Sequence, residues 1–176
     1  KYANSGIVVA VDDKDFAPFK KHGNLRAMYY QQSVEQNMYR VVGQGQVAPA
    51  QRLTDFVKNA SSQNLPESSY QPGLHPTNLR QALPDKVQRV LKDGFKFFGN
   101  KMKGYMSDQA VVVGTESRTS SPVKIPREKI EKHHIRVKNL FPSGEGAGYA
   151  GGIMSAAIDG EKVAEAIFNQ LTVNNR

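Results

Sequence analysis

The amino-acid sequence predicts an α+β fold, in which mixed strands from both chain ends accompany a mostly helical middle. Three observations lead to this prediction. Apolar residues recur at helical spacing over residues 26–42 and 83–98. Compact β-branched runs at residues 6–12 and 109–116 are typical of strands. Near the C-terminus, a glycine-rich turn leads into a last helix over residues 151–171.

The two long helices of the middle region have recognisable ends. Gly43 stands directly after the first helix, where a glycine commonly closes a helix in the left-handed conformation. Pro84 fits the first turn of the second helix. A shorter helix is expected to begin at Leu53. Residues 59–78 are rich in Ser, Asn, Pro and Gly, which predicts a long loop or a stretch that crosses between subdomains.

Strands are expected in four places. The valine-rich segments Gly6–Asp12 and Gln109–Glu116 fit buried strands. Pro122–Arg127 alternates in polarity like a second strand of the C-terminal part, and Leu140–Pro142 is a short run that ends in the glycine-rich turn. The sequence contains no internal repeat.

Composition limits the class of protein. A chain of 176 residues suits one domain with or without a small appendage, and 39% hydrophobic content is enough for a buried core. The absence of cysteine excludes disulfides and thiol chemistry, and the absence of a long apolar run excludes a membrane-spanning helix. Both features favour a cytoplasmic protein with no membrane partner. The chain starts at Lys1 without an initiator methionine, which indicates a fragment.

The formal charge of +8 favours anionic partners such as nucleic acid, cofactor phosphates or anionic substrates. The basic residues are spread along the chain, and acidic residues interrupt the densest patch, Lys124–Lys138, which predicts ordinary solvated faces. His133 and His134 are adjacent and would point to opposite faces of a strand, so no metal site is expected. No side chain is identified as catalytic, because no serine has the His–acid pair that would activate it.

The segment Ser143–Gly148, followed by a helix rich in small residues, has a physical use in binding. Glycines let backbone N–H groups approach a ligand closely, and a helix N-terminus offers unpaired N–H groups and a partial positive charge. A cofactor phosphate or the pyrimidine edge of a flavin suits such a place, and the carboxylate of Glu145 can accept hydrogen bonds from ligand hydroxyls. A tight turn whose small residues serve packing alone is an equally open interpretation.

The stretch Leu140–Gly160 resembles the C-terminal FAD motif of the two-dinucleotide-binding flavoproteins. More narrowly, it is similar to a bacterial family of FAD-dependent dehydrogenases, or oxidoreductases, of poorly defined function. Residues 3–9, 48–53 and 114–123 also resemble that family, so the similarity covers nearly the whole chain. It implies a last helix that faces the flavin and a chain that forms the C-terminal portion of the enzyme.

The resemblance implies roles for two groups of residues. Cofactor-binding residues would be Gly144, Glu145, Gly146, Gly148, Tyr149, Gly151, Gly152 and Ile153. Residues of the flavin or substrate cavity would be Arg118, Thr119, Ser120, Ser121 and, less directly, Gln51 and Arg52. Glu145 would hold a ribitol or ribose hydroxyl of FAD. Arg118 either pairs with its neighbour Glu116 or contacts an anion or the flavin.

The resemblance also implies a division of the chain and a set of partners. Residues 1–19 and 106–176 would complete the FAD domain, and residues 20–105 would form a mainly helical cap over the substrate. The partners would be the N-terminal FAD-binding portion of the same polypeptide, an unknown small-molecule substrate, and a nicotinamide cofactor or another electron carrier. Nucleic acid is not expected among them. The chemistry would be two-electron or hydride transfer through FAD.

One expected feature is missing from the chain. Whole members of the family open with a strand and a Gly-x-Gly-x-x-Gly sequence that holds the FAD pyrophosphate. No such sequence follows the first expected strand, Gly6–Asp12, since Gly43–Ala48 supplies only two of the glycines and stands after a helix. The fragment alone is therefore expected to lack FAD and to be inactive, although the intact protein would be an oxidoreductase. Two other interpretations remain: a basic module that binds nucleic acid or another polyanion, and a scaffold without a cofactor.

Overall fold

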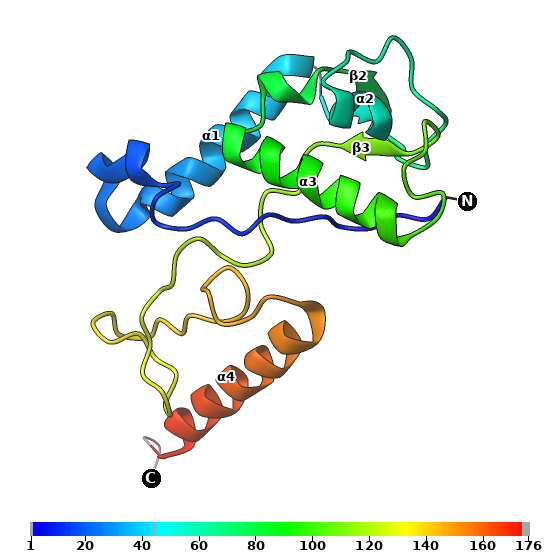
Figure 1. The fold of residues 1–176 in the computed structure, drawn as a ribbon. Coiled ribbons are helices and arrows are strands. Elements are labelled where there is room, and N and C mark those ends of the chain that lie inside the picture. Colours follow the sequence, from blue (N-terminus) through cyan, green and yellow to red (C-terminus); the bar gives the residue numbers. More distant parts are fainter. Residues whose placement is uncertain (1, 44, 174–176) are drawn as a thin grey trace. The chain divides into compact units, whose positions relative to one another are not determined.

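The computed structural model describes residues 2–43 and 45–173 and confirms an α+β fold. The chain forms two compact units: residues 1–17 with 30–117, and residues 18–29 with 118–176. The helices are α1 (Arg26–Val42), α2 (Leu53–Lys58), α3 (Asp85–Lys101) and α4 (Ile153–Val173), with 3-10 segments η1 (Ala17–Leu25) and η2 (Leu79–Gln81), and the strands are β1 (Ala48–Arg52), β2 (Leu74–Pro76) and β3 (Val111–Val113) (Figure 1).

The helical periodicity in the sequence is confirmed. Helix α1 has the predicted bounds, and Gly43 closes it with φ +70° while its N–H donates to the carbonyl of Tyr39 at 2.7 Å. Helices α2, α3 and α4 also lie where they are expected, and Pro84 stands directly before α3 as its N-cap residue. Strand β3 forms the centre of the predicted run at residues 109–116.

A three-stranded sheet of order β2-β1-β3 lies in the first unit. Central strand β1 is parallel to β2 and antiparallel to β3. It contains Pro49, which has no N–H to donate and is normally excluded from central strands. The β3 ladder ends at the pair Ala50–Val113, so Pro49 supplies only its carbonyl, which accepts from the N–H of Gly114 at 2.9 Å. Both β1 and β2 lie inside the region expected to be a helical cap.

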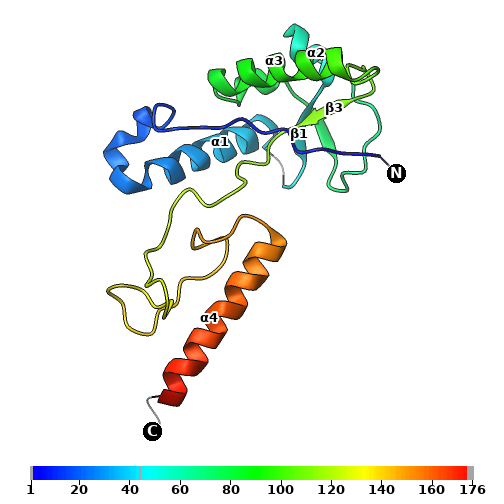
Figure 2. The ribbon, with the colours of Figure 1, turned by 60° about the horizontal axis from the view of Figure 1, so that its bottom comes forward.

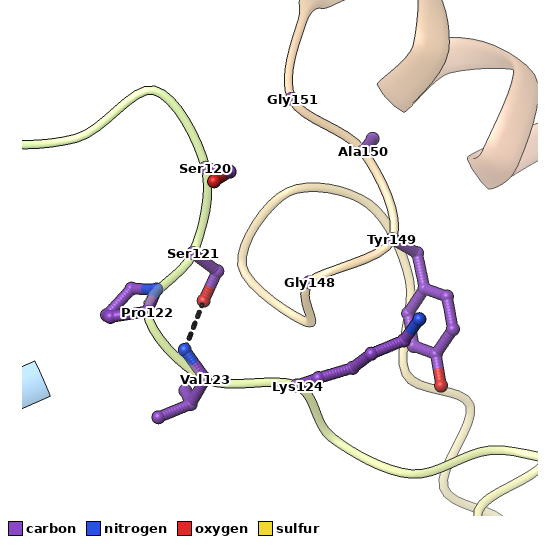
Figure 3. Close-up of a pocket in the computed structure, with 9 residues that line it drawn as sticks. All are labelled: Ser120, Ser121, Pro122, Val123, Lys124, Gly148, Tyr149, Ala150 and Gly151. Atoms are coloured by element: carbon purple, nitrogen blue, oxygen red, sulfur yellow. Dashed lines mark hydrogen bonds between the residues drawn. The ribbon is translucent and has the colours of Figure 1, made fainter. Parts of the chain in front are cut away.

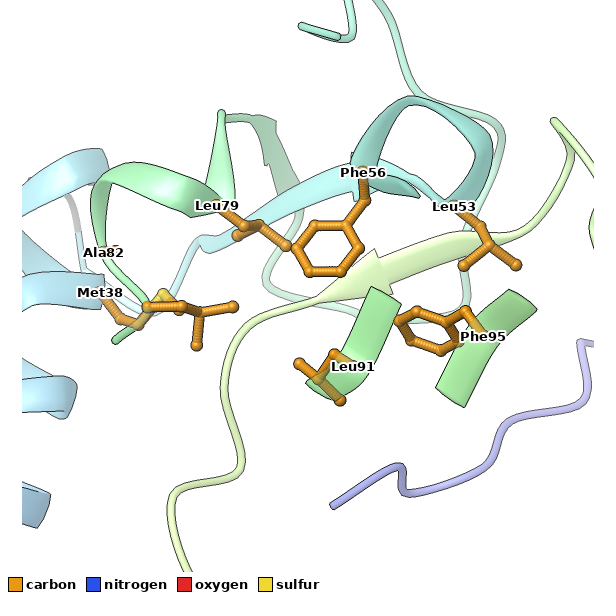
Figure 4. Packing of buried hydrophobic residues seen from close by; sticks show 8 residues of the cluster. Met38, Leu53, Phe56, Leu79, Ala82, Leu91 and Phe95 are labelled. Carbon is orange, nitrogen blue, oxygen red and sulfur yellow. The ribbon is translucent and has the colours of Figure 1, made fainter. Parts of the chain in front are cut away.

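The core of the first unit forms where helices α1, α2 and α3 meet η2. Its buried residues are Met38, Leu53, Phe56, Leu79, Ala82, Leu83, Leu91 and Phe95 (Figure 4). Phe56 lies at the centre, fully buried, and its ring meets that of Phe95 edge-on with centroids 5.9 Å apart. Because these side chains come from segments far apart in sequence, burying them fixes the helices against the sheet.

Gln51 is a polar side chain in this apolar surrounding, and it is fully buried. Its amide nitrogen donates to the carbonyl of Ala60 at 2.5 Å, and its amide oxygen accepts from the N–H of Leu79 at 3.1 Å. One side chain of β1 thereby ties down the loop after α2 and the start of η2. The bond to Leu79 is buried, where water cannot replace it, so the side chain contributes to stability by satisfying that N–H.

The strand expected at Gly6–Asp12 does not form. The segment is extended (Figure 2), and Ile7 and Val9 pack against the core while Val8 is 64% exposed. Alternate residues therefore behave as in a strand, but within the described residues the segment belongs to no ladder. The β-branched composition therefore indicates an extended segment with one buried face, and it does not require a neighbouring strand.

Two further expected strands are also wrong. Pro122–Arg127 has only an isolated bridge between Arg127 and His134, and Leu140–Pro142 is irregular. The prolines in these segments remove N–H donors that a ladder needs. Among the described residues, the strands thus do not come from both chain ends. The predicted division into an FAD part and a cap stays a prediction.

Replacing Gln51 tests the buried amide. Gln51→Ala should lower the free energy of unfolding by about 2–4 kcal/mol, because it leaves the Leu79 N–H and the Ala60 carbonyl without partners and opens a cavity. Urea unfolding followed by circular dichroism measures the change. The control Gln109→Ala removes an exposed amide bonded to Asp108 and should change stability by less than about 0.5 kcal/mol. Equal effects would contradict the role of Gln51.

Candidate functional site

The glycine-rich turn before α4 closes on itself through its backbone. The N–H of Gly148 donates to the carbonyl of Glu145 at 2.9 Å, and the N–H of Tyr149 donates to that of Gly144 at 3.0 Å. Gly144 and Gly148 have φ values of +68° and +83°, which side chains with a Cβ rarely adopt. A Cβ on Gly148 would also lie 2.8 Å from the carbonyl oxygen of Val123. Gly148 is therefore required by the backbone that packs against it.

This packing forms a pocket of about 460 Å³ in the second unit. Five of the residues predicted from sequence line it: Ser120, Ser121, Gly148, Tyr149 and Gly151 (Figure 3). The remaining lining residues are Pro122, Val123, Lys124 and Ala150. The structure thus brings together two stretches that are about 25 residues apart in sequence, and we call the result the serine–glycine pocket.

An ion pair holds the segments around the serine–glycine pocket. Arg127 binds Asp159 of α4 through both guanidinium ends, with N–O distances of 2.6 and 2.9 Å. The side chains are 7% and 12% exposed. Arg127 also donates to the carbonyl of Pro142 at 2.7 Å, and the N–H of Gly144 donates to Asp159 at 2.9 Å. The pair therefore connects the basic loop (residues 124–138), the glycine-rich turn and α4.

These bonds stabilise the ionised carboxylate of Asp159. The hydrogen bond from Arg127, assisted by the N–H of Gly144, lowers the pKa of Asp159 to about 2, although partial burial opposes the shift. The same hydrogen bond raises the pKa of Arg127. Asp159 therefore stays ionised in the folded protein well below neutral pH.

Tyr149 contributes its ring to the serine–glycine pocket and interacts with two cations. The guanidinium carbon of Arg127 lies 3.6 Å from the ring centroid. The ammonium of Lys124 lies 4.4 Å from the same centroid (Figure 3). The phenol donates to the carbonyl of Ile125 at 3.0 Å. Three contacts thereby hold the ring in place, with Lys124 directed over it.

Glu145, the expected ligand for FAD hydroxyls, does not line the serine–glycine pocket. It forms an ion pair with Arg118 at 3.5 Å, and both side chains are more than two-fifths exposed. The partner of Arg118 is therefore Glu145 and not the neighbouring Glu116 that the sequence suggested. An exposed pair of this length is worth less than about 1 kcal/mol, so a ligand could displace either side chain. The FAD role of Glu145 stays a prediction.

Helix α4 begins directly after the serine–glycine pocket. The hydroxyl of Ser155 accepts from the N–H of Gly152 at 3.1 Å and donates to the Gly152 carbonyl at 2.9 Å, which fixes the first turn. Ile153 is 90% exposed at this end. Thr119 approaches from the other side, since a Cβ on Gly151 would lie 3.2 Å from its carbonyl oxygen. Gly146 is exposed, with nothing within 4 Å of an added Cβ.

Gln51 and Arg52, the two weaker candidates, belong to the first unit. The amide nitrogen and the amide oxygen of Gln51 both bond to backbone groups of this unit. Arg52 donates to the carbonyl and side chain of Asn64 at 3.1 and 2.5 Å and to the carbonyl of Asp108 at 2.6 Å. Both side chains therefore support loops of their own unit, and a role in a ligand cavity stays a prediction.

The sequence model described as "FAD-dependent protein, C-terminal domain-like" matches residues 1–119, about two-thirds of the chain. The chain belongs to this family. The match confirms the resemblance found in the sequence, that of a C-terminal portion of an FAD-dependent protein. It contains the first unit, together with residues 18–29 and 118–119 of the second, and ends before the glycine-rich turn.

A relative from Clostridium beijerinckii extends the similarity beyond residue 119. It is an uncharacterized protein that is 42% identical over 170 residues, which cover 96% of this chain and 31% of the relative. The chain thus spans less than a third of that relative's length. The relative therefore has room for much more than a C-terminal domain.

Sequence reasoning missed Lys124, Arg127 and Asp159 as residues of the site. The two basic residues lie in the patch that was interpreted as a solvated face. A signal was present in Asp159, an acid in the first turns of an otherwise apolar stretch of helix. Such an acid on a helix of small and apolar residues calls for a buried partner, but 31 intervening residues separate it from Arg127.

The described part of the chain has neither a membrane-spanning helix nor a cluster of metal ligands. Over residues 2–43 and 45–173, none of the helices combines the length and apolarity that crossing a lipid bilayer requires. The same residues contain no group of three or more His, Asp or Glu side chains that could together hold a metal ion.

Removing the carboxylate of Asp159 should destabilise the second unit. Asp159→Asn is expected to lower the free energy of unfolding by about 2–4 kcal/mol near neutral pH, since it leaves a mostly buried Arg127 without its partner. The lowered pKa means that this stabilisation is present above the unfolded-state value near 3.8 and is lost as the pH falls toward about 2. The gap between the two proteins should therefore shrink in acid.

Urea unfolding at several pH values, followed by circular dichroism, measures this gap. Glu161→Gln is the control, because Glu161 is an exposed carboxylate on the same helix, and its effect should stay below about 0.5 kcal/mol. A gap that does not narrow in acid would show that Asp159 acts through packing alone.

A matched pair of glycine variants tests the turn. Gly148→Ala should lower the free energy of unfolding by about 1–3 kcal/mol, because its φ is positive and its Cβ would collide with Val123. Gly146→Ala should be nearly neutral, since the space around it is open. Thermal unfolding of both variants measures the difference, and equal melting temperatures would contradict the described turn.

Proposed function

We propose that this chain supplies the second half of the flavin site in an FAD-dependent oxidoreductase. An N-terminal FAD-binding portion of the same polypeptide would supply the other half and hold the FAD pyrophosphate. Membership of the FAD-dependent family supports the cofactor, and the length of the Clostridium beijerinckii relative supports a second portion. The serine–glycine pocket is the observation that carries the proposal, because it joins five of the residues expected near a flavin.

The serine–glycine pocket has the chemistry that one edge of a flavin needs. Ser120 and Ser121 offer hydroxyls, and the turn from Gly148 to Gly151 offers backbone groups without bulky side chains. When bound, FAD would supply the two-electron chemistry. Lys124 and the N-terminal end of α4 provide positive charge, which would stabilise negative charge that develops on a ligand in the pocket. Arg127 and Asp159 keep these parts in position.

The surface of α4 supports a partner that covers it. Ile153, Met154, Phe168 and Leu171 are 59–90% exposed, whereas Val163 on another side of the helix is 6% exposed. Large apolar side chains gathered along one exposed helix are unfavourable in water and are typical of a surface that another part of a protein covers. The N-terminal portion is the partner we propose for it.

The proposal gives two expectations for cofactor content. The chain alone should bind FAD weakly or not at all, because its one Gly-x-Gly-x-x-Gly match, Gly146–Gly151, lies in the turn before α4 and does not follow a strand, as the pyrophosphate-binding fingerprint does. In the polypeptide that joins this chain to its N-terminal portion, Glu145→Ala should weaken FAD retention about tenfold through the loss of a charged hydrogen bond. Flavin absorbance per protein after dialysis measures both.

Glu131→Ala is the matched control, because it removes an exposed carboxylate of the same unit whose partner is His133. Its flavin content should equal that of the unaltered protein. Stoichiometric, tightly held FAD in the chain alone would contradict the proposal that this chain supplies only half of the flavin site, which we call the flavin half-site. Unchanged flavin content in Glu145→Ala would refute the role of Glu145 and leave the half-site standing.

A further inference from the structure

A second recess lies on the basic loop, and it is distinct from the serine–glycine pocket. It has a volume of about 540 Å³ and is lined by Lys124, Arg127, Glu128, Lys129, Lys132 and Tyr149. The two hollows share only Lys124 and Tyr149. We call it the lysine recess.

The loop that forms the lysine recess is held in a defined shape. Arg127 and His134 form an antiparallel bridge, and the N–H of Glu128 donates to the carbonyl of His133 at 2.7 Å. The carboxylate of Glu128 accepts from the N–H groups of Ile130 and Glu131 at 2.5 and 2.8 Å, which closes the turn. These bonds fix the backbone on which Lys129 and Lys132 stand.

The charges around the lysine recess are unbalanced. Asp159 neutralises Arg127 through the bidentate pair, so that this guanidinium contributes little free charge. Three lysines then face one carboxylate, that of Glu128, and that carboxylate already accepts two backbone N–H groups. The lining therefore carries a surplus of positive charge that no acidic side chain of the lining balances.

The form of this charge indicates the kind of ligand. The cations that lack a carboxylate partner are ammonium groups, although Lys132 donates to the carbonyl of Lys129 and Lys124 lies over the Tyr149 ring. Ammonium groups bind phosphate as point charges without demanding a planar partner. The ring of Tyr149 already makes cation–π contacts with Lys124 and Arg127, so it offers little free surface on which a base could stack. Recognition in the lysine recess therefore rests on negative charge rather than on an aromatic surface.

We propose that the lysine recess is a second ligand site, which binds a phosphate group of the substrate or of the electron carrier. The identity of the ligand rests on the proposed function, whereas the anion site itself can be tested separately, because neither Lys129 nor Lys132 lines the serine–glycine pocket. It places a phosphorylated molecule next to the flavin edge through the two shared residues. The folded loop supplies the charge in advance, so little ordering of the loop is needed when the ligand binds.

Calorimetric titration of the chain with inorganic pyrophosphate, at an ionic strength kept constant with chloride, tests the site. Lys129→Gln/Lys132→Gln should weaken binding about tenfold or more, since each lost contact to an anion is worth about 1 kcal/mol or more. Lys101→Gln/Lys103→Gln is the matched control, because it removes the same charge from the first unit. That control should change the affinity by less than about twofold.

Circular dichroism of each variant verifies that the fold is kept. Equal weakening in both double variants would show diffuse attraction to a basic protein and would overturn the proposal. Absence of pyrophosphate binding to the unaltered chain would overturn it as well. Because no flavin takes part, neither result depends on the success of the flavin half-site.

Competition against pyrophosphate distinguishes the two sources of phosphate. Displacement by NADPH, with weaker displacement by NADH, would support an electron carrier whose extra phosphate enters the lysine recess. Displacement by glycerol phosphate and not by NADPH would support a phosphorylated substrate. Displacement by none of these compounds would overturn a role for the lysine recess in binding phosphorylated ligands.

Discussion

The bidentate pair between Arg127 and Asp159 is the interaction on which the second unit depends. Outside α4, residues 118–152 contain an isolated bridge and turns but no strand or helix. Without a ladder, the backbone needs side chains to fix it. A single guanidinium reaches the helix and the carbonyl of Pro142, and the opposing carboxylate reaches the N–H of Gly144. Buried pairs add little net stability, but they define a geometry sharply.

Both hollows of the second unit follow from this constraint. Tyr149 packs on the guanidinium that Asp159 holds, and Lys124 in turn lies over the ring. The serine–glycine pocket lies where Tyr149 and Lys124 meet the glycine-rich backbone. The lysine recess lies where the same two residues meet the charged side chains of the basic loop. The first unit is organised differently, since an apolar cluster with one buried amide, that of Gln51, determines its shape. An ion pair therefore determines the backbone geometry of the second unit, whereas burial of apolar side chains determines that of the first.

Local pattern predicted the helices well because their signals are local. Apolar spacing and Gly43 are enough to define α1, and the glycine-rich turn marks the start of α4. The sheet was harder, because β1 is buried on all sides and contains Pro49, so it lacks the alternation that identifies strands. Conversely, Gly6–Asp12 has strand composition without a partner strand. Of the site, glycines and serines were predicted, whereas Arg127 and Asp159 meet only through the tertiary fold.

The open surroundings of Gly146 make it a suitable position for attaching a label. A side chain there would extend into solvent, one turn residue away from the buried Ala147 and two from Gly148 of the serine–glycine pocket. The chain contains no cysteine, so a single thiol introduced at this position would be the sole site for a dye or spin label. A reporter attached in this way would sense ligands that enter the pocket without occupying any of its lining groups.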